Sequence, residues 1–72
     1  MNPYENLANA IVLSAANDYR DALKKLARGR RNSDAERTKV ECLRFFRSAW
    51  FGILTTLDPE VLIEKLDAEV GA

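Results

Sequence analysis

The side chains that most often carry catalysis are scarce in this sequence. It contains no histidine and a single cysteine, Cys42. Histidine is the commonest general base, and a zinc centre needs several Cys or His ligands, so neither kind of site is expected. The helical spacing of its neighbours places Cys42 on an apolar face, where a thiol is inert rather than nucleophilic. We predict that the chain is not an enzyme and holds no metal or cofactor.

Acidic side chains are more numerous, but their spacing is typical of surface ion pairs. Four of them could gather carboxylates on the first two predicted helices: Asp18, Asp21, Glu36 and Glu41. Basic residues stand three or four positions from Asp21 and Glu41, which is the spacing of charge pairs along a helix surface. No glycine-rich phosphate-binding loop accompanies them. These carboxylates therefore do not indicate an acid–base site.

Basic side chains gather in the middle of the chain, and binding of nucleic acid is the alternative function. Residues 20–47 hold ten basic and four acidic groups. The residues that could contact phosphates lie around a short loop: Lys24, Lys25, Arg28, Arg30 and Arg31. Residues 58–72, however, carry one basic and five acidic groups, and the whole chain has a net charge of zero. Nucleic-acid-binding domains are usually net basic, so we expect instead a solvated loop that pairs with the acidic third helix.

Three helices are predicted, at residues 4–28, 34–55 and 59–70, because apolar residues recur every three or four positions in each. Gly29 ends the first helix, and Ser33 with Glu36 forms a capping box that starts the second. Asp58 followed by Pro59 starts the third. We predict an all-α domain spanning residues 1–72, with an antiparallel helical hairpin and a short third helix.

Aromatic residues crowd into the second predicted helix, in the stretch RFFRSAWFGIL at residues 44–54. On the wheel of one continuous helix, the apolar arc covers roughly 240°, whereas an ordinary surface helix has a stripe a little over 100° wide. We predict that Phe46, Trp50 and Ile53 fill the core of the chain. The residues that the other two helices cannot cover form a predicted protein interface: Val40, Arg44, Phe45, Arg47 and Phe51.

A second copy of the chain is the partner that this interface favours. A chain of 72 residues buries only about 60% of its extended surface, and one cysteine allows no internal disulfide. Two-fold dimers are the commonest oligomers. We therefore expect a homodimeric helical bundle built around the second helix.

The expected location is the cytoplasm. Residues 1–15 lack the basic start and cleavage site of a signal peptide. The longest apolar run, AWFGIL, is far too short to cross a bilayer. A lone thiol also fits a reducing compartment.

Two long stretches, AANDYRDALKKL and ECLRFFRSAWFGILTTLDPEVLIEKL, carry a resemblance that spans nearly the whole chain outside the loop at 28–34. The chain resembles uncharacterised small helical proteins carried by prophages and conjugative elements of Gram-positive gut bacteria. The resemblance implies no catalytic residues. It implies a mobile-element setting, in which small proteins often bind a host or phage protein. The predicted function is a non-enzymatic protein–protein interaction module.

Overall fold

The computed structural model describes residues 3–29 and 31–71 and, within these ranges, the side chains from Asn6 onward. The described chain is all-α, as predicted, but it contains four helices instead of three. They are α1 (Pro3–Ala27), α2 (Ser33–Phe46), α3 (Ala49–Leu54) and α4 (Pro59–Gly71).

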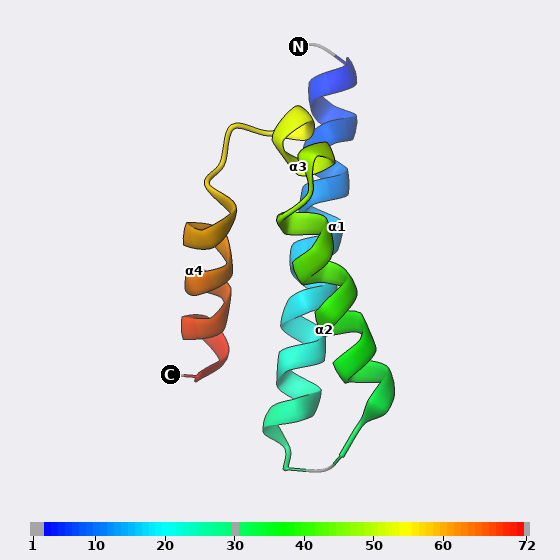
Figure 1. Ribbon diagram of the computed structural model, residues 1–72, viewed down its shortest axis with the longest axis vertical. Coiled ribbons are helices and arrows are strands. Elements are labelled where there is room, and N and C mark those ends of the chain that lie inside the picture. The colour runs from blue at the N-terminus through cyan, green and yellow to red at the C-terminus, as the bar shows by residue number, and fades with distance from the viewer. Residues whose placement is uncertain (1–2, 30, 72) are drawn as a thin grey trace.

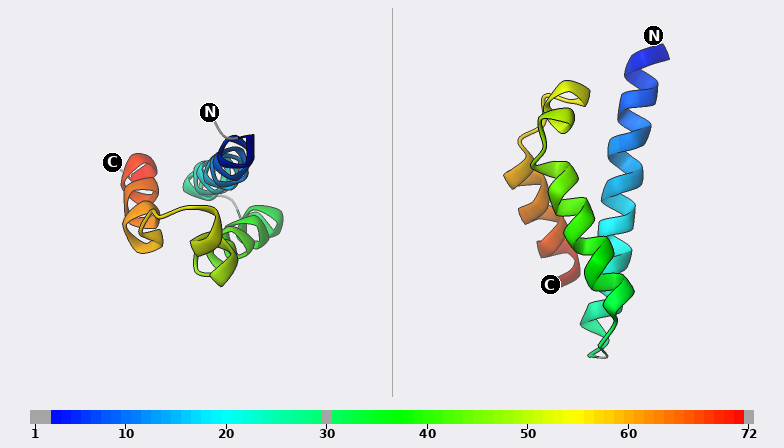
Figure 2. Two further views of the ribbon diagram at one scale, coloured as in Figure 1. Left: turned by 90° about the horizontal axis from the view of Figure 1, so that it is seen from above. Right: turned by 45° about the vertical axis from the view of Figure 1, so that its right-hand side comes forward.

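The helices form an elongated molecule with extents of 42 × 22 × 21 Å. α2 runs back alongside α1 in the opposite direction, and α4 packs against one side of this pair (Figure 1). The short α3 lies beside the N-terminal part of α1, at one end of the molecule (Figure 2). The opposite end is formed by the turn between α1 and α2.

Local sequence features explain where α1 ends and where α2 and α4 begin. α1 closes at Gly29, whose φ of 78° suits glycine better than other residues. The side chain of Asn32 caps α2 by accepting a hydrogen bond from the Ala35 amide at 2.9 Å. The predicted cap, Ser33, is instead the first residue of that helix. The Asp58 carboxylate accepts from the amides at positions 60 and 61, as expected for the cap of α4.

The second predicted helix, residues 34–55, is two helices in the structure. α2 ends at Phe46, and Ser48 adopts an extended backbone with φ −84° and ψ 158°. The Ser48 hydroxyl donates to the Phe45 carbonyl at 2.6 Å and accepts from the Phe51 amide at 3.3 Å. One side chain therefore closes α2 and caps α3, and the prediction of one continuous helix is wrong at this serine.

This break gathers three phenylalanine rings into the core. In a straight helix Phe46 and Phe51 would point about 140° apart. After the break, Phe45, Phe46 and Phe51 meet pairwise with ring centroids 5.7 to 5.9 Å apart. Tyr19 of α1 meets Phe46 edge-on at 5.8 Å. Such ring pairs contribute about 0.5–1.5 kcal/mol each beyond their buried area, so they fix the position of α3 on the bundle.

Small residues bring α2 close to α1. Ala16 and Ala22 are buried on α1, and Ala35 is buried on α2. The Cys42 thiol lies 3.6 Å from the carbonyl oxygen of Ala15, which shows how closely the two backbones approach. The remaining core comes mainly from Val12 and from two residues of α4, Ile63 and Leu66.

The acidic helix α4 is held by one polar contact of the core and two ion pairs. The Tyr19 hydroxyl donates to Asp67 at 2.5 Å. Arg20 of α1 contacts Glu69 at 2.7 Å. Arg47, at the end of α2, contacts Glu60 at 2.9 Å. Among the described residues, the predicted pairing of the basic loop with the acidic helix is not found, because α4 pairs instead with two arginines outside that loop.

Candidate interaction surface

In the aromatic stretch, two residues predicted to be buried are exposed in the structure, and one predicted to be exposed is buried. Phe51, a residue of the predicted interface, is 1% exposed and belongs to the core. Trp50 and Ile53, predicted core residues, are 55% and 76% exposed. The reason is the break at Ser48, because α3 starts with a new rotational setting that turns Phe51 inward and its neighbours outward. Both predictions depended on one continuous helix, and both are wrong.

The other predicted interface residues are only partly available to a partner. Val40 and Arg44 are exposed on α2. Phe45 is half-buried against the aromatic core. Arg47 is exposed, but its guanidinium already pairs with Glu60. The structure therefore does not gather these residues into one apolar surface.

Three of the seven large exposed apolar residues of the described chain lie in or directly after α3. α3 has the sequence AWFGIL and carries no charged residue. Trp50 and Ile53 face solvent from this helix, and Leu57 follows it with 53% of its surface exposed. We call these three residues the α3 surface. Leu7, in the N-terminal part of α1, is also exposed, at 61%.

The α3 surface has a signal in the sequence. An apolar arc of roughly 240° is too wide for one helix of a folded chain, which normally shows little more than 100°. Ser48 interrupts that arc and is a preferred N-cap residue. Two shorter helices with separate apolar faces would have followed from treating Ser48 as a cap.

The basic residues of the alternative function lie at the other end of the molecule. Lys25, Arg28 and Arg31 line a hollow of about 490 Å³ together with Asn32. Lys24 is exposed nearby on α1. Among the described residues, none of these four cations makes an ion pair. Arg30 lies outside the described residues.

Cys42 lies in the core and is 7% exposed. Burial raises the pKa of its thiol, and the negative charges of Asp18 and Glu41 raise that pKa further. A thiol of this kind stays protonated near neutral pH and is a poor nucleophile. In the part of the chain that the structure describes, no group of three or more His, Cys, Asp or Glu residues gathers as metal ligands would.

None of the described helices combines the length and the apolar character that a membrane span needs. Comparisons of the chain with protein-family models, with curated proteins and with solved structures found no match.

Proposed function

We propose that this chain is a non-enzymatic interaction protein that binds another protein chain through the α3 surface. The observation that carries the proposal is the exposure of Trp50 and Ile53 on a helix without charged residues. Tryptophan is enriched among the residues that dominate binding energy at protein interfaces. Contiguous exposed apolar residues of this kind usually mark an interaction surface.

A second copy of the chain is the partner that we propose first. A standard interface buries about 800 Å² on each partner, of which roughly 60% is apolar. The exposed parts of the α3 surface and of Leu7 supply on the order of 500 Å² of apolar area. Because α3 carries no charge, a two-fold contact between two α3 surfaces brings no like charges of that helix together. The proposed assembly is a homodimer joined at the α3 ends of two helical bundles.

The resemblance to small proteins of prophages and conjugative elements supports a mobile-element setting. In that setting a host or phage protein would compete with the second copy for the α3 surface. Both partners bury the same apolar residues, so variants of this surface weaken both associations.

Sedimentation equilibrium of the whole chain tests the proposal. We expect the wild type to associate in the micromolar range and the double variant Trp50→Asp/Ile53→Asp to sediment as a monomer. Leu13→Asp is the matched control, because Leu13 is a similarly exposed apolar residue, at 60%, and belongs to α1 and not to the α3 surface. A strict monomer at several hundred micromolar wild-type chain would refute the homodimer. Equal loss of association in the control would refute the assignment to the α3 surface.

Nucleic-acid binding is the second candidate, and the cluster of three cations around one hollow supports it. Neutralising phosphates with these cations would give an affinity that falls with salt. An electrophoretic shift at low salt, lost in Arg28→Glu/Arg31→Glu but kept in Trp50→Asp/Ile53→Asp, is the expected sign of this function. No shift with single-stranded or duplex probes would rule it out.

A further inference from the structure

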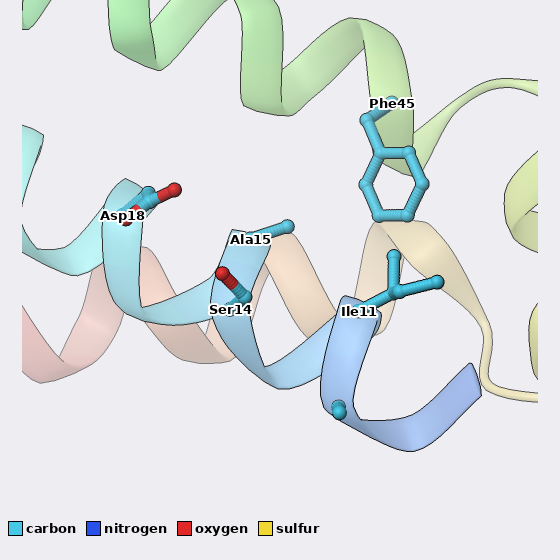
Figure 3. Close-up of a pocket in the computed structure, with 6 residues that line it drawn as sticks. Ile11, Ser14, Ala15, Asp18 and Phe45 are labelled. Atoms are coloured by element: carbon cyan, nitrogen blue, oxygen red, sulfur yellow. The ribbon is translucent and has the colours of Figure 1, made fainter. Parts of the chain in front are cut away.

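A groove runs between α1 and α2 on the side of this pair that faces away from α4. It consists of two hollows of about 380 and 360 Å³, and Asp18 lines both. In Figure 3 the Phe45 ring reaches from α2 toward Ile11 of α1, with Ser14 and Asp18 further along the groove. Asp18 and the α4 partner Arg20 are two residues apart, or about 200° around the helix, so the groove and α4 lie on different sides of α1.

The groove is apolar at one end and acidic at the other. The apolar end is lined by Ala10, Ile11, Ala15 and Phe45, with Ser14 as a small polar residue. The acidic end carries the carboxylates of Asp18, Asp34 and Glu41 against one ammonium group, that of Lys25. Among the described residues, none of these three carboxylates takes part in an ion pair.

The fold already shows how the α1–α2 pair holds a helix on its other side. There α4 places Ile63 and Leu66 in the core. Its acidic residues pair with Arg20 and Arg47, which stand at two separate points along that side. An acidic helix is thus bound where the pair displays arginines. By the same electrostatic rule, the opposite side, which displays carboxylates, favours a basic helix.

A parallel stack of two copies is unfavourable in this groove. Two copies that stack these faces in parallel, so that both apolar ends and both acidic ends meet, would place Asp18 and Glu41 next to the same residues of the partner copy. Like charges brought together in an interface cost several kcal/mol. Its carboxylates therefore give the groove a different chemistry from the uncharged α3 surface.

We propose that this groove binds an amphipathic helix of a partner protein, with apolar side chains beside Ile11 and Phe45 and lysines or arginines beside Asp18 and Glu41. From residue 10 to residue 25 the groove follows α1 for about 22 Å, which matches about 15 residues of a bound helix. This is the helix-in-groove mode of recognition. It goes beyond the proposed function, because it uses a second surface and a partner of different chemistry.

Two capped, fluorescently labelled 16-residue peptides test the proposal with the full chain. Both carry leucines at helical spacing in one half, and the other half carries three lysines in one peptide and three glutamates in its match. We expect the lysine peptide to bind at least tenfold more tightly by fluorescence anisotropy. The double variant Asp18→Lys/Glu41→Lys should reverse this preference. Glu36→Lys/Glu64→Lys, with the same change of net charge at exposed positions outside the groove lining, should keep it.

Amide chemical shifts of the chain identify where the peptide binds. Shifts confined to the groove, at Ile11, Ala15, Glu41 and Phe45, support the proposal. Shifts at Trp50 and its neighbours, equal binding of both peptides, or no binding of either at millimolar concentration would overturn it. Concentration-dependent shifts at Ile11 and Phe45 without peptide would place a second copy in the groove and also overturn it.

The two proposals fail separately. The variant Trp50→Asp/Ile53→Asp removes the α3 surface and is expected to bind the lysine peptide as the wild type does. Loss of self-association therefore leaves the groove proposal standing, and loss of peptide binding leaves the α3 surface standing.

Discussion

Phe51 and Ile53 show how strongly single residues differ within one short helix. They are two positions apart, yet Phe51 is 1% exposed and Ile53 is 76% exposed. Phe51 contacts the rings of Phe45 and Phe46 with edge-on geometry, whereas Ile53 contributes little to the core. The phenylalanines of the aromatic stretch therefore contribute most of its stabilising free energy. The exposed residues contribute little to stability and can contact a partner.

Replacing Phe51 or Ile53 by alanine tests whether the first residue stabilises the fold and the second does not. Phe51→Ala is expected to lower the free energy of unfolding by about 3–5 kcal/mol, because it removes a buried ring and leaves a cavity. Ile53→Ala is expected to change it by less than about 0.5 kcal/mol. Urea denaturation followed by circular dichroism, at the lowest practical chain concentration, measures both. Phe51→Leu supplies a milder variant if the alanine variant does not fold, and a larger loss in Ile53→Ala than in Phe51→Leu would contradict the structure.

Tyr19 gives the chain a specific response to high pH. Burial raises the pKa of its phenol, and the hydrogen bond to the Asp67 carboxylate and the charge of that carboxylate raise it further. In the unfolded chain a tyrosine loses its proton near pH 10. Above that pH the unfolded state binds fewer protons than the folded state, so stability falls as pH rises.

This fall is expected to be steeper in the wild type than in Tyr19→Phe, by up to about 1.4 kcal/mol per pH unit above pH 10. Urea midpoints between pH 8 and pH 11 measure the difference. Near neutral pH the variant loses a hydrogen bond to a charged group, which costs about 1.5–3 kcal/mol. Parallel pH profiles of the two proteins would show that the phenol does not remain protonated in the fold.

At the scale of the element, the decisive feature is the junction between α2 and α3. The Ser48 side chain satisfies a carbonyl at the end of α2 and an amide at the start of α3. Its extended backbone sets the rotation of α3, which determines which apolar residues enter the core and which face solvent. The α3 surface is therefore a consequence of one capping residue.

Ser48→Ala is expected to destabilise the chain by about 1 kcal/mol, the usual cost of losing an N-cap. Ser48→Thr keeps a hydroxyl for both hydrogen bonds and serves as the control, with a change of a few tenths of a kcal/mol expected. Because the alanine variant also favours a continuous helix, we expect the Trp50 fluorescence maximum to move as the tryptophan changes environment. An unchanged stability and an unchanged emission maximum would show that Ser48 does not set the junction.

The junction also marks where sequence patterns stop being informative. The two outer predicted helices, 4–28 and 59–70, agree with α1 and α4 to within a residue, because glycine, proline and a capping aspartate mark ends of these helices locally. Ser48 carries a weaker signal, since a serine is also tolerated inside a helix. Its role depends on the ring contacts that the break permits, and these are tertiary contacts. The junction decides which residues of α3 are exposed. Because the sequence did not reveal it, the exposure of these residues was predicted wrongly.

At the scale of the whole molecule, charge is divided between the two sides of the α1–α2 pair. One side displays Arg20 and Arg47 and holds the acidic helix α4. The other side displays Asp18, Asp34 and Glu41 along the groove. The α1–α2 pair therefore has a side with arginines and a side with carboxylates, although the net charge of the chain is zero. The acidic helix α4 packs on the side with the arginines.

Acid is expected to loosen the contact with α4. The hydrogen bond from Arg47 lowers the pKa of Glu60, and that from Arg20 lowers the pKa of Glu69. The stability from these pairs is present above the unfolded value near pH 4.3 and is lost as pH falls through the lower folded values. Urea midpoints from pH 2.5 to pH 7 should decline less in Glu60→Gln/Glu69→Gln than in the wild type. Glu64→Gln, an exposed residue without an ion pair among the described residues, should follow the wild type.

The proposed self-association would link the stability of the whole molecule to its concentration. If two folded chains bind through the α3 surface, mass action stabilises the folded state as concentration rises above the dissociation constant. For a domain of this size we expect the thermal midpoint to rise by about 3–5 °C for each tenfold increase in concentration. Differential scanning calorimetry over two decades of concentration measures this slope.

Three variants show where the slope comes from. Trp50→Asp/Ile53→Asp should remove it, because aspartates on the α3 surface oppose each other in a two-fold contact. Leu13→Asp and Asp18→Lys/Glu41→Lys should keep it, since neither changes that surface. A flat midpoint in the wild type would mean that the exposed tryptophan does not serve self-association. A slope lost in the Asp18→Lys/Glu41→Lys variant would instead place the dimer contact in the groove.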